Sequence, residues 1–197
     1  MSAWQSSSLI SNKLRIINNE YKESVRVYVA LVIFAVAAFT LNAARAFPDG
    51  APWGAANPAA EQHCASCHFD ADQVRDSVAL VVEGLPSEPI PGSTYELKII
   101  FQDPDIVIAG FQLIAHAGHE QAGTFASSDA NIEFIGAAIR STAPAKGDEG
   151  ASWVVEWHAP GELTMPVVFH VAASAANDDG SPFGDTIHYR SYRLPAE

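Results

Sequence analysis

The sequence predicts an all-β fold, an antiparallel β-sandwich, preceded by an N-terminal helix and a second, short helix. Beyond about residue 76 the chain consists of seven or eight short apolar or alternating runs, separated by clusters of Gly, Pro, Asn, Asp and Ser. Residues 94–99 alternate between polar and apolar side chains, which is typical of a strand with one solvated face. Residues 167–169 are continuously apolar, which suits a central strand.

Residues 1–46 are predicted to be a signal peptide or an N-terminal membrane anchor. Residues 27–41 carry no charge and follow a stretch with several basic side chains. This run suits the apolar region of a signal peptide, about 7–15 residues, better than a membrane span of about 20. An Ala-x-Ala cleavage pattern at residues 44–46 predicts a mature chain that begins at Phe47. The alternative is an uncleaved helix that attaches the protein to the membrane through residues 27–46.

Both alternatives place the rest of the chain outside the cytoplasm, in the periplasm or on the extracellular face of the cell envelope. The formal net charge is −12, from 11 Lys and Arg against 23 Asp and Glu. Removal of residues 1–46 would make the chain more acidic still, because basic residues outnumber acidic ones there. Such a surface repels nucleic acid and anionic lipid, and it favours basic proteins or metal cations as partners.

Residues 47–75 are predicted to form a leader arm. Its first part, residues 47–57, is rich in Gly, Pro and Ala. Asn57 followed by Pro58 is a good helix start, with Asn as the cap and Pro in the first turn. We expect the helix to run to about Phe69 and to carry the most informative motif of the chain.

That motif is C-x-x-C-H, formed by Cys64, Cys67 and His68, and it is the pattern to which haem is covalently attached in c-type cytochromes. Two thiols three positions apart on one helical turn can each add across one vinyl group of the porphyrin. The following histidine can then supply the proximal iron ligand. The motif therefore predicts one covalently bound haem c, and the chain contains only these two cysteines.

Three other interpretations of the motif stay open at this point. A local Cys64–Cys67 disulfide of the thioredoxin kind would normally follow a strand in a βαβ unit, and a Gly/Ala-rich loop stands there instead. A zinc site would need a fourth ligand, and no second C-x-x-C or H-x-x-x-H pair is present. The motif could also be a degenerate one that is never loaded with haem.

The position of the motif predicts where a haem would lie. A helical cytochrome c wraps its porphyrin in several helices, but here strands are expected within about ten residues of His68. A haem on this arm must therefore lie against the outside or the end of the sandwich and stay partly exposed. The predicted core is already filled by Phe111, Trp153, Trp157, Val168 and Phe169.

The sixth iron ligand has several candidates. His63 adjoins Cys64 and cannot reach the opposite face of the same haem. The remaining candidates are His116, His119, His158, His170, His188 and Met165. A histidine on a strand is usually a surface or core residue, so five-coordination, or a ligand from a partner, stays an equal alternative. Histidine would give a low potential and methionine a higher one.

Residues 76–197 are predicted to form the sandwich domain. The expected strands, in chain order, are Val78–Glu83, Thr94–Gln102, Ile108–Ala117, Gly123–Ala126, Ile132–Arg140, Ser152–His158, Pro166–Ala173 and Asp185–Leu194. Trp153 and Trp157 share one face of their strand and are interpreted as core residues.

Several stretches of the chain follow the order found in one known family. They are residues 47–54 and 64–68, Pro91–Leu97, Ala109–Leu113, Ala122–Phe125, Trp153–Trp157 with Ala159-Pro160, Val168-Phe169, Ala175–Gly180 and Gly184–Ile187. The chain thereby resembles the bacterial Reelin-domain-like family, also called the choice-of-anchor V domain. This resemblance implies a Greek-key, immunoglobulin-like sandwich outside the cytoplasm. It does not imply any particular activity. His158 and His188 depart from the family pattern, which more usually has a hydroxyl or aromatic residue there.

Two functional hypotheses follow from the sequence. The first is an exported monohaem c-type protein that passes electrons to an unidentified redox partner protein and is not an enzyme. The second is a cell-surface binding or adhesion module, in which C-x-x-C-H is unloaded or disulfide-bonded. A small sensor or enzyme with an open haem site has less support. Phosphate-loop, Ser-His-Asp, H-E-x-x-H and EF-hand motifs are absent from the sequence.

Overall fold

The structure is a computed structural model that describes residues 22, 25–26, 28–31, 50–146, 150–179, 181 and 183–196. The chain divides into two compact units, residues 1–44 and 45–197. In the first unit the described residues are helical. Within the described part of the chain, no helix is both long enough and apolar enough to cross a lipid bilayer. The predicted cleavage site at residues 44–46 lies outside the described residues.

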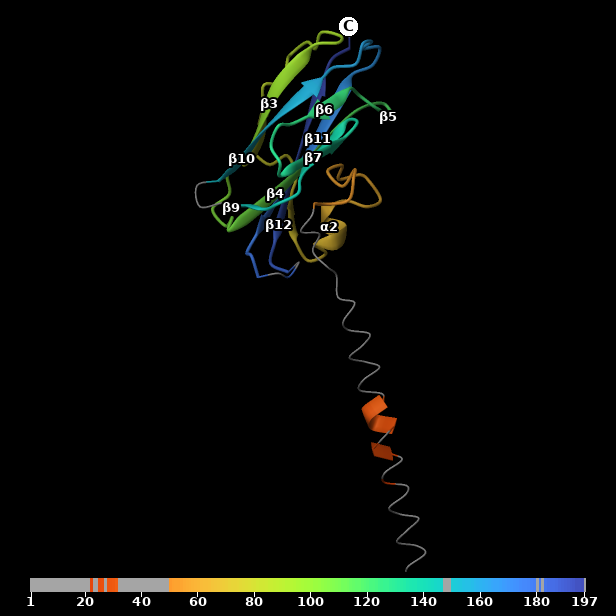
Figure 1. The fold of residues 1–197 in the computed structure, drawn as a ribbon, viewed down its shortest axis with the longest axis vertical. Helices are drawn as coiled ribbons and strands as arrows, with labels where there is room; N and C mark the ends of the chain where they lie inside the picture. The colour runs from red at the N-terminus through yellow and green to blue at the C-terminus, as the bar shows by residue number, and fades with distance from the viewer. Residues whose placement is uncertain are drawn as a thin grey trace, which may run out of the picture. The chain divides into compact units, whose positions relative to one another are not determined.

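The second unit is a β-sandwich of two sheets, as the sequence predicts (Figure 1). Neighbouring strands of the first sheet follow the order β1 (Asp72–Val74), β12 (Thr186–Leu194), β11 (Val167–Ala176), β4 (Ile108–Ala117), β8 (Ala138–Ser141) and β7 (Ile132–Ile135), while β5 (Glu120–Gln121) and β9 (Ala145–Lys146) also pair with β4. The second sheet follows the order β2 (Leu80–Glu83), β3 (Thr94–Phe101), β10 (Ala151–His158) and β6 (Thr124–Ala126). The pairs are antiparallel except that β1 runs parallel to β12.

The core lies between the two sheets and is built by strict alternation. Strand β10 buries every second residue, including Trp153 and Trp157, which confirms their interpretation as core residues. Trp157 is fully buried, packs its ring against Phe169 at 4.9 Å, and donates its Nε1–H to the carbonyl of Ala122 at 3.0 Å. A buried indole whose single donor is satisfied fixes the spacing of the two layers.

One predicted core residue was wrong. Val168 is half-buried and belongs to the outer face of β11, because its neighbours Val167 and Phe169 both point into the core. Successive strand residues point to opposite faces, so three consecutive apolar residues cannot all face one side. Strand β11 is nevertheless central, as predicted, since it pairs with β12 on one side and β4 on the other.

Two other expectations differ from the structure. The predicted strand over residues 132–140 is a hairpin, β7 and β8, which turns at Gly136 with φ of +54°. The predicted helix over residues 58–69 is reduced to one turn, α2 (Cys64–Cys67). Residues before it form turns, because the Asn57 side chain accepts from the Ala59 N–H and the Ala56 N–H bonds to a side chain of the first sheet. The short strands β1, β5 and β9 were not predicted.

Candidate functional site

The leader arm is anchored on the outer face of the first sheet, the face that points away from the second sheet. Gln112 of β4 is almost fully buried there, with 1% of its surface exposed. Its Oε1 accepts from the Ala56 N–H at 3.1 Å, and its Nε2 donates to the carbonyl of Pro52 at 2.9 Å. The Gln112 side chain therefore supplies hydrogen-bond partners to backbone groups at two points of the arm. These bonds offset the cost of burying the Gln112 amide and those backbone groups.

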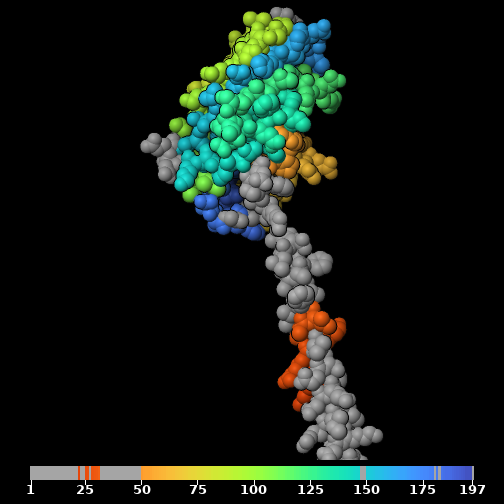
Figure 2. All heavy atoms as spheres, in the orientation of Figure 1, coloured from red at the N-terminus to blue at the C-terminus, as the bar shows by residue number. Residues whose placement is uncertain are grey.

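Arg140 of β8 anchors the beginning of the arm. Its guanidinium donates to the carbonyls of Gly50 and Ala51, lies 4.2 Å from the centre of the Trp53 ring, and pairs with Glu133 at 2.8 Å. Figure 2 shows the arm, in orange, lying against the green and teal surface of the β5–β8 region. The arm is thus part of the sandwich domain and is held by several independent contacts.

Helix α2 is anchored by Tyr189 of β12. The Tyr189 hydroxyl accepts from the Ala65 N–H at 3.2 Å and lies 3.4 Å from His63 Nδ1. Its ring packs in a small second core with Ala56, Ala172 and Ile187, and Cys64 packs against this cluster. Burial, followed by the nearby Cys64, raises the pKa of Tyr189 to about 12. Tyr189 therefore stays a neutral hydroxyl at physiological pH and can hold the helix.

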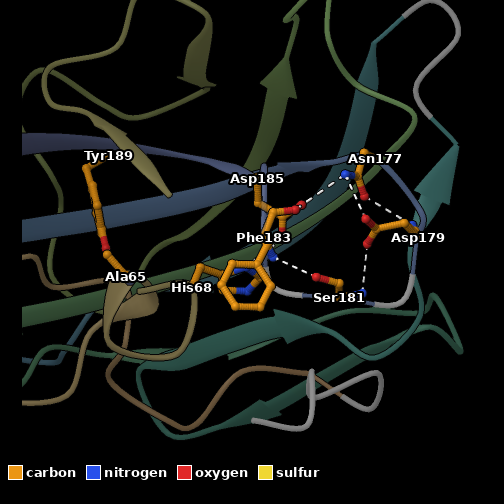
Figure 3. Close-up of polar contacts among 8 residues, drawn as sticks. All are labelled: Ala65, His68, Asn177, Asp179, Ser181, Phe183, Asp185 and Tyr189. Carbon is orange, nitrogen blue, oxygen red and sulfur yellow. Dashed lines mark hydrogen bonds and ion pairs between the residues drawn. The ribbon is translucent and has the colours of Figure 1, made fainter. Parts of the chain in front are cut away.

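His68, directly after α2, meets a buried carboxylate. Its Nδ1 lies 2.7 Å from Oδ2 of Asp185, and the Asp185 side chain is only 2% exposed. Figure 3 shows the two residues with the loop that precedes β12. In that loop the Asn177 amide donates to the carbonyl of Phe183, and the Phe183 ring packs edge-on against Phe69 at 5.0 Å. Two consecutive arm residues thus contact the same loop.

A cavity of about 560 Å³ opens between the arm and the outer face of the first sheet. Both cysteines, His68 and Asp185 line it. The lining also includes small and apolar residues of the first sheet and its loops, among them Ile108, Gly110, Ala172, Ser174, Ala176 and Pro144. The volume falls in the range of about 300–1,000 Å³ typical of small-molecule and cofactor sites.

The two cysteines are free thiols in this structure. Cys64 Sγ donates to the carbonyl of Ala55 at 3.4 Å, and burial, with a smaller contribution from Cys67, raises the pKa of Cys64 to about 12. Cys64 is therefore a protonated thiol at physiological pH and not a thiolate nucleophile. Among the described residues, no group of three or more His, Cys, Asp and Glu side chains is arranged to hold a metal ion.

The residues around the cavity have the chemistry that a covalently attached haem requires. The two thiols open on the same cavity as His68, whose Nδ1 is engaged by Asp185, so Nε2 is the nitrogen left for a metal. A metal-binding histidine typically has its second nitrogen bonded to a carboxylate or carbonyl in this way. At Gly110 a Cβ would come within 3.2 Å of Ser141 Oγ and 3.7 Å of Ser174 Oγ, so the bare glycine keeps this part of the cavity open.

The candidates for the sixth ligand lie elsewhere among the described residues, and none of them lines this cavity. His116 and His170 stack on each other at 5.0 Å, and His116 bonds to the Gly118 carbonyl. His188 points inward, toward Ser77 and the Phe101 ring.

The other three candidates are on the surface. His158 bonds to Thr94 on the second sheet, while His119 and Met165 are exposed. His63 does line the cavity. The identity of a sixth ligand therefore stays a prediction.

Four residues that complete the site have no signal in the sequence. Gln112, Arg140 and Tyr189 resemble ordinary strand residues, and Asp185 is the first residue of an expected strand. Each contacts the arm across a large sequence separation, for example 117 residues between His68 and Asp185. Period-two alternation showed which residues share a face of the sheet, but not that the arm covers that face.

No family model and no curated protein matches the sequence. Among solved structures, the reeler domain of human F-spondin is similar, with 17% identity and a TM-score of 0.49 over 65% of this chain and 95% of that one. The Reelin-N domain of F-spondin is similar with 22% identity and a TM-score of 0.49, over 66% and 94% of the two chains. The assignment as a β-sandwich rests on the strand pairing itself.

Proposed function

We propose that this chain is an exported monohaem c-type cytochrome-like protein that transfers electrons in the periplasm or at the cell surface. The observation that carries the proposal is that Cys64, Cys67 and His68 open together on one cavity next to the sandwich. A C-x-x-C-H motif that occurs by chance would have no reason to line a space of this size together with small residues of the sheet.

Each residue of the motif has a separate task in this proposal. The thiols of Cys64 and Cys67 would each add across one vinyl group: sulfur would bond to one carbon and the thiol hydrogen would go to the next, so no oxidant is consumed. His68 would hold the iron through Nε2, because its Nδ1 is engaged by Asp185. When bound, haem supplies an iron centre that gains and loses one electron.

The contacts that hold the arm in place also support this function. Arg140, Gln112 and Tyr189 hold the arm at its beginning, at its middle and at α2, so the three motif residues have a defined position relative to the sheet. Rigid positioning of the ligand limits the rearrangement that accompanies electron transfer. The acidic surface, with a net charge of −12, supports a basic redox partner protein.

The proposal is tested by producing the full chain in a host that carries cytochrome c maturation machinery. Wild-type protein should keep its haem through denaturing electrophoresis, because thioether bonds survive unfolding, and C64A/C67A should not. Glu61→Gln, a change at an exposed position of the arm that does not line the cavity, is the control and should keep the haem. A colourless wild-type protein at normal expression would overturn the proposal and favour the adhesion module instead.

A further inference from the structure

Asp185 is a buried acidic residue with an unusual set of contacts. Its Oδ2 lies 2.7 Å from His68 Nδ1, whereas its Oδ1 is buried without a hydrogen-bond partner in the structure. A buried carboxylate normally has hydrogen bonds to both oxygens or a cation beside it, because an uncompensated buried charge costs roughly several kcal/mol. The compensation available to Asp185 is concentrated on the ring of His68.

The surroundings of the pair add no positive charge. The described residues that line the cavity include no Lys or Arg, and two further acidic residues, Asp178 and Asp179, lie on the same lining. The carboxylate of Asp185 therefore acts on His68 without competition from another cation at the cavity. A charge-assisted N–H···O bond of this length is about twice as strong as a neutral one.

The loop that precedes Asp185 carries contacts of its own. The Asn177 side chain accepts from the Asp179 N–H, and Phe183 packs on Phe69, next to His68. Figure 3 shows Asn177 and Asp179 on the side of Asp185 away from Ala65 of α2. The loop and the arm thus meet beside the pair formed by His68 and the buried Asp185.

We propose that Asp185 is a positioning residue that polarises the His68 imidazole and lowers the reduction potential of the iron centre. This rests on the proposed function. The carboxylate draws the Nδ1 proton toward itself, which increases the negative charge on the ring and makes Nε2 a stronger donor. A stronger donor, in an acidic cavity, stabilises the oxidised iron relative to the reduced one.

The test compares Asp185→Asn with Asp178→Asn in haem-loaded full chain. Asn can still accept the His68 N–H, so D185N removes the charge while it keeps the contact. Asp178 lines the same cavity, has a positive φ of 61° that Asn tolerates well, and has no contact with His68 recorded in the structure. D178N is therefore a matched control for the loss of one negative charge at the cavity.

The midpoint potential of each variant is measured by a one-electron spectroelectrochemical titration. D185N should favour the reduced state at least tenfold more than wild type, which is a rise of about 59 mV. D178N should change the equilibrium less than threefold. The iron–histidine stretching frequency of the reduced protein, measured by resonance Raman, should fall in D185N and stay unchanged in D178N, because only the first variant weakens the donor.

The outcomes separate the two proposals. If wild-type protein carries no haem, the proposed function fails. If it carries haem but D185N leaves both the potential and the stretching frequency unchanged, the inference fails while the proposed function stands. Equal shifts in D185N and D178N would mean that general charge, and not polarisation of His68, sets the potential. If D185N does not fold, Asp185→Glu, which keeps the charge but displaces it, should still change the stretching frequency, and an unchanged frequency overturns the inference.

Discussion

Gln112 is polar and buried, and its side chain contacts the arm instead of the core. Strand residues on the outer face of a sheet are normally solvated, but here that face is covered by residues 50–68. The amide of Gln112 satisfies three backbone groups, the Ala56 N–H and the carbonyls of Ala51 and Pro52. An aliphatic side chain of similar size would leave the buried Ala56 N–H without this partner, whereas the Ala51 carbonyl would keep Arg140 and the Pro52 carbonyl would keep the Ala55 N–H.

We expect Gln112→Leu to lower the free energy of unfolding by about 1–3 kcal/mol, the cost of leaving the buried Ala56 N–H unsatisfied. Denaturant unfolding followed by tryptophan fluorescence measures this. Gln102→Leu, the same change at an exposed position beyond β3, is the control and should change stability by less than about 0.5 kcal/mol. Equal stability of the two variants would show that the arm is not held through Gln112.

At the scale of elements, the turns that lead into the strands depend on glycine for two different reasons. Gly123 precedes β6 with φ of +76°, and a Cβ there would lie 2.2 Å from the carbonyl oxygen of His158. Gly92 precedes β3 with φ of +72°, and a Cβ there would meet nothing within 4 Å. The first glycine is needed for conformation and for space, the second for conformation alone.

Gly92→Ala should therefore cost about 1–2 kcal/mol of stability, the penalty of a left-handed conformation for an L-residue. Gly123→Ala should cost at least about twice as much, because the pairing of β6 with β10 must also open. Comparison of the unfolding midpoints of the two variants separates the cost of the left-handed conformation from the cost of the close approach. Equal losses in both variants would refute the close approach at Gly123.

The neighbouring strands β4 and β11 bring His116 and His170 together, and this pair makes stability depend on pH. Burial, followed by the nearby His116, lowers the pKa of His170 below its ordinary value of 6.5. The unfolded chain then binds the proton more tightly than the folded chain, so stability rises with pH across this range. The contribution is complete above about pH 6.5 and is lost as the pH falls below it.

When the pH falls from 7.5 to 5.5, the free energy of unfolding of the His170→Gln variant should therefore decrease by less than that of wild type. Thermal unfolding in matched buffers measures the difference. His119→Gln removes an exposed histidine of the turn after β4 and should keep the wild-type pH profile. A pH profile of H170Q that matches wild type would contradict the assignment.

At the scale of the whole molecule, local pattern predicted the sandwich, and long-range contacts determined the site. Strands such as β4 matched the expected bounds, because alternation and turn residues are local signals. Helix α2 is shorter than expected, because the Ala65 N–H bonds to the Tyr189 hydroxyl and the Cys64 N–H to the Ala55 carbonyl, instead of to carbonyls of a preceding helical turn. Asp185 could not be predicted as a partner of His68, because the two residues are 117 positions apart and no local pattern encodes their proximity.

The large sequence separation across the site has a consequence for the order of events during synthesis. The arm is made first, whereas its partners Asp185 and Tyr189 follow 117 and 124 residues after His68 and Ala65. Cys64 packs against the small second core, in which Ile187 and Tyr189 belong to β12. These two contacts of Cys64 form only when the C-terminal strand joins the sheet. If haem is attached as proposed, the Cys64 thiol would therefore be easier to reach before β12 is in place than afterwards.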